Sequence, residues 1–102
     1  MTASFILTPS AARDVEGIID FVLESSGADR ALYLHKRLYE GFAKIGAMPN
    51  VGHMRDDLGD ESLRVYTVFK FLVIFRPDTK PVQILRVIHG ARDLPMAFSE
   101  EP

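Results

Sequence analysis

The chain has 102 residues, of which 47% are hydrophobic and 25% are charged, and its formal net charge at pH 7 is −2. This size fits one globular domain over residues 1–102, and the slightly acidic balance disfavours a domain that binds nucleic acid by bulk electrostatics. The absence of cysteine excludes a disulfide framework and thiolate catalysis, and no segment approaches the ~20 apolar residues of a transmembrane helix. We therefore expect a cytoplasmic protein with no role at a membrane.

The first 30 residues predict a short strand followed by an amphipathic helix. Residues Ser4–Leu7 are β-prone, and Thr8 places a capping hydroxyl before Pro9, which suits the first helical position. Apolar residues then recur at three- and four-residue steps, at Ala12, Val15, Ile19 and Val22. The helix is expected to end near Ser25–Gly27, where glycine suits a C-terminal cap.

A second amphipathic helix is expected after Asp29 and ends at Met48-Pro49. Its apolar face contains Ala31, Leu34, Leu38, Phe42 and Ile45. Tyr39 should border this face, whereas Tyr33 should be more exposed. Because each helix has one apolar face and one charged face, we expect the two to form a hairpin that covers an apolar sheet.

The second half of the chain predicts antiparallel strands. Residues 51–62 form a surface loop rich in glycine and acids, and strand-like runs follow at Leu63–Val68, at Phe71–Phe75 and from Val82 into His89–Asp93. Phe69-Lys70 is a tight connection or a bend, and the tail 95–102 is expected to fray. The order β-α-α-β-β-β predicts an α+β fold in which a two-helix hairpin packs on a mainly antiparallel four-stranded sheet.

Charge is unevenly distributed along the chain. Between residues 62 and 92, Asp78 is the only acid, against the basic residues Arg64, Lys70, Arg76, Lys80, Arg86 and Arg92. Such a surface suits an acidic peptide or a polyanion, or it is the solvated face of a sheet. The loop residues His53, Asp56, Asp57, Asp60 and Glu61 lack metal-ligand spacing, so we expect a solvated loop, with no metal and no cofactor.

Several of these segments resemble one family of bacterial proteins. The order of elements, the Met48-Pro49 to Gly52 signal, Arg64 at the start of a strand, FLVIF at 71–75 and ILRVIHGARDL at 84–94 resemble the RelE/ParE superfamily of toxin-antitoxin toxins. The ParE-like branch, whose members are often labelled plasmid stabilisation proteins, is the most similar, and the resemblance covers residues 4–94. It implies the α+β fold above and a cognate antitoxin that wraps the toxin in a hetero-oligomer.

The resemblance also implies a poison of central machinery, which is DNA gyrase in parts of the ParE branch and ribosome-bound mRNA in the RelE branch. RNA cleavage through a 2′-hydroxyl needs a base, cations for the phosphate and an acid. Arg64 and Arg86 lie where the RelE branch has phosphate-binding arginines, and His89 is the candidate acid or base. Lys70 and Glu61 are further candidate bases.

This catalytic set is incomplete. No tyrosine follows Tyr66, and Phe98 has no hydroxyl where many RelE-like nucleases carry a catalytic tyrosine. We therefore favour a non-enzymatic ParE-like toxin that poisons gyrase by protein binding. The alternatives are a RelE-like ribosome-dependent mRNA endoribonuclease, with Arg64, Arg86 and His89 catalytic, and a degenerate family member that binds its antitoxin without toxicity.

The candidate partner-binding residues are Arg64, Lys70, Arg86, His89, Arg92 and Phe98. Several of these residues also have structural interpretations. Arg86 is a candidate for a half-buried ion pair with Asp14 or Asp20, and His89 for a cap on local backbone groups. Gly90 is expected to permit a backbone angle that other residues avoid, Arg92 and Asp93 form a candidate ion pair, and Phe98 either contacts the target or packs on the core.

Overall fold

The computed structural model describes residues 4–92 and 94–99 and has an α+β architecture. Its elements are β1 (Phe5–Leu7), α1 (Pro9–Ser26), α2 (Ala28–Ala47), the 3₁₀ turn η1 (Asp56–Leu58), β2 (Arg64–Val68), β3 (Phe71–Arg76), β4 (Val82–His89) and α3 (Leu94–Ser99). The strand order is β1-β4-β3-β2, with β1 parallel to β4 and the other pairs antiparallel. The predicted fold class is confirmed. Of the helices in the described ranges, none has the length and apolarity to cross a membrane.

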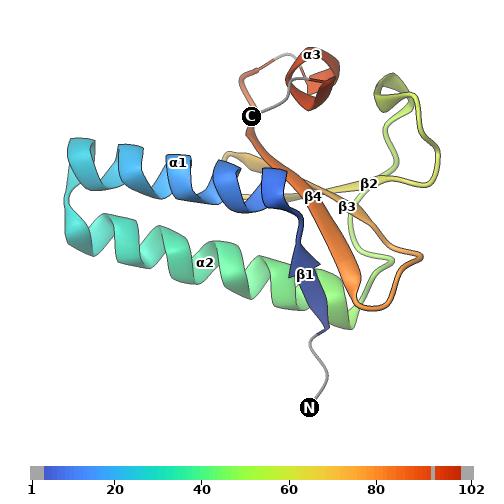
Figure 1. Cartoon of the computed structure of the whole chain (residues 1–102), viewed down its shortest axis with the longest axis horizontal. Helices are drawn as coiled ribbons and strands as arrows, with labels where there is room; N and C mark the ends of the chain where they lie inside the picture. The colour runs from blue at the N-terminus through green and yellow to red at the C-terminus, as the bar shows by residue number, and fades with distance from the viewer. Residues whose placement is uncertain (1–3, 93, 100–102) are drawn as a thin grey trace.

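The helices α1 and α2 form the predicted hairpin, and they run side by side in Figure 1. Thr8 caps α1, because its Oγ1 accepts the Ala11 N–H at 3.2 Å, and Pro9 occupies the first turn. Gly27 alone ends α1 and begins α2, with φ of 93°. A junction of one residue needs this backbone angle, which glycine adopts without steric cost.

The main core lies between this hairpin and the sheet. The predicted apolar face of α2 is confirmed, since its five residues are all buried. On α1 the prediction of Ala12 was wrong, because Ala11 is fully buried and Ala12 is exposed. The other three predicted positions, Val15, Ile19 and Val22, do contact the core, together with Ala11 and Ile18. The contact stripe therefore begins at Ala11, which lies about 100° around the helix from Ala12.

A β-bulge in β4 directs the end of this strand into a second core, which lies on the other face of the sheet. Ile74 pairs with Arg86 whereas its neighbour Phe75 pairs with Ile84, so Leu85 is an extra residue in β4. A bulge reverses the alternation of side chains beyond it. Ile84 therefore faces α1 and α2, while Ile88 faces away from them with Ile74.

The short helix α3, which was not predicted from the sequence, covers this second core. Leu94 and Ala97 are buried against a cluster that includes Leu63, Val65, Ile74 and Ile88, and Phe98 packs at its edge. Figure 1 shows α3 well apart from the α1–α2 hairpin. Residues 100–102 of the predicted tail lie outside the described residues.

The edge of β4 beyond β1 is completed by α1. Strand pairing with β1 ends at Leu7 opposite Ile84. The next groups bond to α1 and its cap: the Thr8 N–H donates to the Ile84 carbonyl at 3.0 Å, and the Thr8 hydroxyl donates to the Leu85 carbonyl at 3.0 Å. The Val87 N–H donates to Asp14 Oδ2 at 2.9 Å. The helix thus replaces a strand, which leaves these buried backbone groups satisfied.

Asp14 also forms a buried ion pair with Arg86. Arg86 Nε donates to Asp14 Oδ2 at 2.7 Å and Nη2 donates to Asp14 Oδ1 at 3.1 Å, which is a bidentate geometry. Arg86 Nη1 donates to the Ala97 carbonyl of α3 at 3.0 Å. The residue is 6% exposed, and of the two predicted partners, Asp14 and Asp20, the structure selects Asp14. Arg86 therefore joins α1, β4 and α3.

Two glycines near the strands are required by close approaches. A Cβ on Gly52 would lie 2.4 Å from the Val65 carbonyl oxygen, and the φ of Gly52 is +85°. The prediction that Gly90 has a backbone angle unavailable to other residues was wrong, because its φ lies outside the left-handed range. Its N–H donates to the Lys70 carbonyl at 2.7 Å, and a Cβ would come within 3.2 Å of that oxygen. Close backbone approach explains the glycine at position 90.

We predict that two glycine-to-alanine changes have opposite effects on the free energy of unfolding. Gly52→Ala should lower it by more than about 1–2 kcal/mol, because it combines a positive φ with a backbone clash. Gly17→Ala should raise it by about 0.5–1 kcal/mol, since Gly17 lies inside α1 with open space around it. Urea denaturation followed by circular dichroism measures both, and equal effects would contradict this account.

We also predict that Asp14 contributes far more to stability than its neighbour Asp20. Asp14→Ala should cost about 3–5 kcal/mol, because it leaves the Arg86 guanidinium buried without a carboxylate. Asp20→Ala is the matched control, since Asp20 is exposed on the same helix. The urea midpoints of the two variants test this, and a similar small loss in both would show that the buried pair is not a major constraint.

Candidate functional site

A groove of about 920 Å³ lies between the helical hairpin and one end of the sheet. We call it the helix–sheet groove. It is lined by Ile18, Phe21 and Val22 of α1, by Tyr33 and Leu34 of α2, and by Phe69–Phe71 and Val87–His89 of the β2–β3 turn and β4. Its walls come from four parts of the chain, so it exists only in the folded protein.

Exposed aromatic side chains form much of the groove wall. Phe21 is 71% exposed, Tyr33 is 55% exposed and Phe69 is 49% exposed. The prediction for the two tyrosines is confirmed, because Tyr39 packs against Phe42 with ring centroids 5.1 Å apart. A concentration of exposed aromatic surface of this kind is typical of a protein-binding site. Phe21 and Phe69 were not among the predicted site residues.

The sequence contains only weak indications that Phe21 and Phe69 belong to the site. Phe21 follows Ile18 by three residues and so extends the apolar stripe of α1 toward solvent. Phe69 lies in the two-residue connection between Val68 and Phe71, where an aromatic residue is uncommon.

Basic side chains surround the groove. Arg13, Arg30 and Lys70 line it and are exposed. Among the described lining residues the one carboxylate is Asp14, which is paired with Arg86. The groove therefore combines an apolar floor with a positively charged rim.

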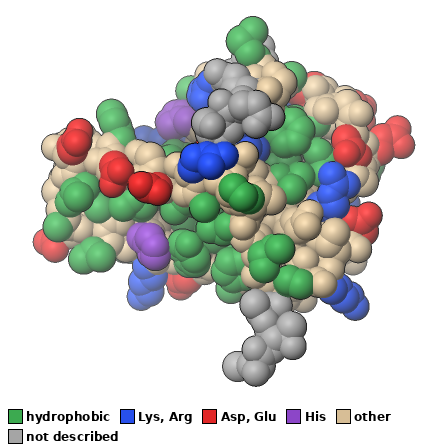
Figure 2. Space-filling view, in the orientation of Figure 1, with side chains coloured by type: hydrophobic (Ala, Val, Ile, Leu, Met, Phe, Trp, Pro, Cys, Tyr) green, Lys and Arg blue, Asp and Glu red, His purple; other side chains and the backbone are tan. Residues whose placement is uncertain are grey.

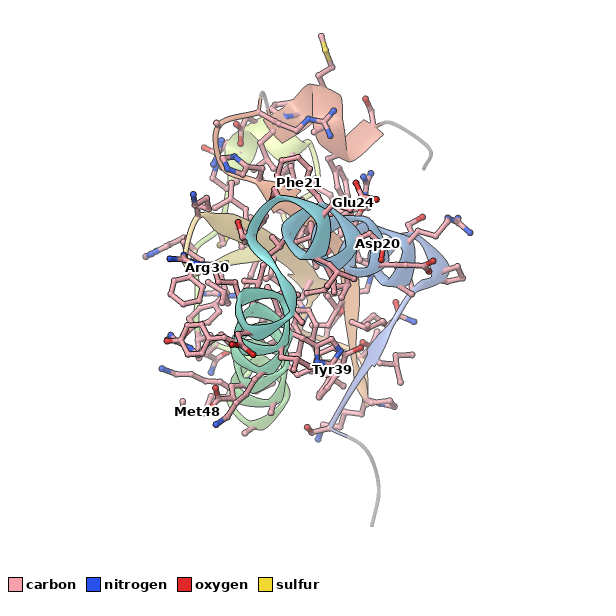
Figure 3. The ribbon with its side chains drawn as sticks, turned by 90° about the vertical axis from the view of Figure 1, so that its left-hand side faces the viewer. Asp20, Phe21, Glu24, Arg30, Tyr39 and Met48 are labelled. Carbon is pink, nitrogen blue, oxygen red and sulfur yellow. The ribbon has the colours of Figure 1, made fainter. Side chains whose placement is uncertain are left out.

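The other acids of α1, Glu16, Asp20 and Glu24, do not line the groove. Figure 3 shows Arg30 on one side of the hairpin and Asp20 and Glu24 on the other. Figure 2 shows acidic side chains along the outward face of α1. Opposite charges are thus separated across the hairpin, although the net charge of the whole chain is only −2.

Four of the six predicted partner-binding residues line the helix–sheet groove: Lys70, Arg86, His89 and Arg92. Phe71 pairs with His89, and the Lys70 carbonyl accepts the Gly90 N–H, so the turn after β2 lies beside the end of β4. This pairing brings Lys70 and His89 to the same rim. Arg64 and Phe98 are not among the groove-lining residues.

His89 caps local backbone groups, which was the structural interpretation of this residue. Its Nδ1 accepts the Ala91 N–H at 3.0 Å, and its ring packs edge-on against Phe71 at a centroid distance of 5.5 Å. The side chain remains exposed at the groove rim. The predicted partner of Arg92, Asp93, lies outside the described residues.

Arg64 holds the loop that precedes β2. Its Nε donates to the Val51 carbonyl at 3.2 Å, and its Nη2 donates to the carbonyls of Asn50 and Gly52, each at 3.0 Å. The same loop is fixed by mutual hydrogen bonds between His53 and Val65, both at 2.8 Å. The guanidinium of Arg64 is therefore directed at the protein's own backbone.

Phe98 and the acidic loop lie on the face of the sheet that α3 covers. Phe98 is half-buried beside the second core, as expected for packing on the core, and its carbonyl lies 3.4 Å from Arg86 Nη1. In the loop, a hydrogen bond from Arg55 lowers the pKa of Asp57, and hydrogen bonds from the Ser62 hydroxyl and N–H lower the pKa of Asp60. Within residues 4–92 and 94–99, no three metal-ligating side chains converge on one point.

Comparisons with known proteins agree with this fold. The family described as ParE toxin of type II toxin-antitoxin system, parDE, matches residues 5–94. Toxin ParE3 of Caulobacter vibrioides is 29% identical over 89 residues, covering 87% of this chain and 88% of that protein. A solved structure titled "Chromosomal ParDE TA system from P. aeruginosa" matches with a TM-score of 0.71 at 27% identity, over 86% of this chain and 96% of the other. Because the family match extends over nearly all of the chain, this protein belongs to the ParE family of toxins of type II toxin-antitoxin systems.

Proposed function

We propose that this chain is a cytoplasmic toxin that arrests growth by binding a protein target, DNA gyrase, and that a cognate antitoxin neutralises it in a hetero-oligomer. Its membership of the ParE family supports the assignment as a toxin. The choice between protein binding and RNA cleavage depends on the two arginines that a RelE-like nuclease would use.

The observation that carries the non-enzymatic mechanism is that both arginines are engaged within the fold. Arg86 is buried and its charge is neutralised by Asp14, while Arg64 donates three hydrogen bonds to backbone carbonyls. Stabilising the charge on a scissile phosphate requires cationic donors that are directed at the substrate. Of the three candidate catalytic residues, only His89 is exposed. His89 supplies an acid or a base, but neither Arg64 nor Arg86 is directed outward to bind a phosphate beside it.

The helix–sheet groove is the proposed site for the antitoxin. An amphipathic helix lays its apolar face into such a groove through residues at three- and four-residue spacing. The exposed side chains Phe21 and Tyr33 offer apolar contacts, and Arg13, Arg30 and Lys70 offer charge to acidic residues that flank them. Complementary charge of this kind accelerates association and selects the partner. We therefore infer an antitoxin segment that is both helical and acidic.

The decisive experiment is induction of this chain alone in a bacterium, with early samples assayed in parallel for double-strand DNA breaks and for cleavage of ribosome-bound mRNA. We expect growth arrest with DNA breaks and intact mRNA. Codon-phased mRNA cuts would establish the nuclease alternative. Soluble expression without arrest would indicate a family member that binds its antitoxin without toxicity.

We predict that charge reversal in the groove weakens antitoxin binding while the same change outside it does not. Arg30→Glu should raise the Kd for the cognate antitoxin about tenfold, which is about 1.4 kcal/mol, through a slower association rate. Lys36→Glu is the matched control, because Lys36 is exposed on α2 but does not line the groove. Binding is measured by calorimetry and stopped flow at two salt concentrations. Equal effects of the two variants would place the antitoxin elsewhere.

A further inference from the structure

The turn between β2 and β3 has a phenylalanine at a position that favours glycine. Val68 pairs with Phe71, so the connection consists of Phe69 and Lys70. Phe69 has φ of +54°, and it is the non-glycine residue with a positive φ in the part of the chain that the structure describes. A two-residue hairpin with a positive φ at its first position alone follows the type II′ pattern, in which glycine is the usual residue. A side chain with a Cβ is strained there.

Burial does not compensate this strain, since 49% of Phe69 remains exposed. The hairpin has other supports. Val68 packs closely over Gly41 of α2, where a Cβ would lie 2.6 Å from Val68 Cγ2, and β3 is paired along its length with β2 and β4. Strain at an exposed, well-supported position is a feature of binding sites.

The ring of Phe69 is nevertheless held in one place. The Arg37 guanidinium carbon lies 4.5 Å from its centroid, and the Tyr33 ring lies 6.0 Å away. Arg37 is itself oriented, because its Nη1 donates to the Tyr33 hydroxyl at 3.2 Å and its Nε lies 3.9 Å from Glu40. A ring fixed by a cation and a second ring loses little rotamer entropy when a partner covers it.

We propose that Phe69 is a preorganised anchor that receives an apolar side chain of an acidic helical segment bound in the helix–sheet groove. Phe69 lies on the groove wall with Tyr33 and Phe21, and Lys70 beside it places a positive charge next to the apolar contact. The ring and the adjacent cation together suit a segment in which an apolar residue is followed closely by an acid. This inference rests on the antitoxin site proposed above and identifies the residue that determines its specificity.

The test compares stability and binding in Phe69→Gly. Glycine relieves the strained backbone, so the melting temperature should be no lower than that of the wild type. The Kd for a synthetic peptide of the antitoxin's acidic helical segment should rise at least tenfold. Phe69→Trp, which retains an aromatic ring, should bind the peptide within about threefold of the wild type. Leu32→Ala is the control, because Leu32 is 69% exposed on α2 without lining the groove, and it should leave the Kd unchanged.

Three outcomes would overturn the proposal. If the melting temperature of Phe69→Gly falls by several degrees, the ring is a structural support of the hairpin. If Phe69→Gly leaves the Kd unchanged while Arg30→Glu raises it, the groove binds the antitoxin but Phe69 is not its anchor. If neither the peptide nor the full antitoxin binds the wild-type chain, the proposed function itself fails.

Discussion

The bidentate ion pair between Asp14 and Arg86 determines how the three layers of this protein meet. Asp14 belongs to α1, Arg86 to the bulged part of β4, and the remaining guanidinium nitrogen of Arg86 reaches the carbonyl of Ala97 in α3. Asp14 also accepts the Val87 N–H, which β1 is too short to cover. A buried pair of this kind is weak evidence of net stabilisation, but removing one partner is costly, so it specifies one arrangement over others. The groove depends on this arrangement, since α1 supplies one wall and β4 another.

Arg86 shows that a position used for catalysis in one branch of a superfamily can have a structural role in another. Arg86 lies where the resemblance to the RelE branch would place a phosphate-binding arginine, yet here it joins a helix on each side of the sheet. Arg64 has a comparable role at the loop before β2. Both guanidinium groups are directed at the protein itself, whereas Arg13, Arg30 and Lys70 are exposed around the helix–sheet groove, which also presents exposed aromatic side chains. This combination of exposed charge and aromatic surface is what supports the proposed role in protein recognition.

Periodicity in the sequence predicted the elements that are long and regular. The buried face of α2 was predicted correctly because five apolar residues recur along one side of the helix. On α1, Ala11 and Ala12 are adjacent and identical, so nothing in the sequence shows which of them is buried. The six-residue α3 is too short for a periodic pattern. The sequence does not show which side chains of β4 lie on which face of the sheet, because apolar and polar residues do not alternate along the strand. The bulge at Leu85, which changes the face, arises from the pairing of β4 with β3. At the candidate site, the pairing of β3 with β4 brings Lys70 close to His89 and Arg92. The role proposed for Phe69 rests on its backbone angle, which neither composition nor residue spacing reveals.

The pairing of β1 with β4 has a consequence for how the chain acquires its structure during synthesis. Phe5 is opposite Val82, and β4 lies between β1 and β3 in the sheet. The ribosome releases the helical hairpin first, but the apolar surface that the hairpin covers is incomplete until the last strand has emerged. Contacts between such distant parts of the chain also form slowly, because the loop between them must close first. A nascent chain therefore lacks any activity that depends on the fold, and the helix–sheet groove, which is the site proposed for the antitoxin, forms only after β4 has been made.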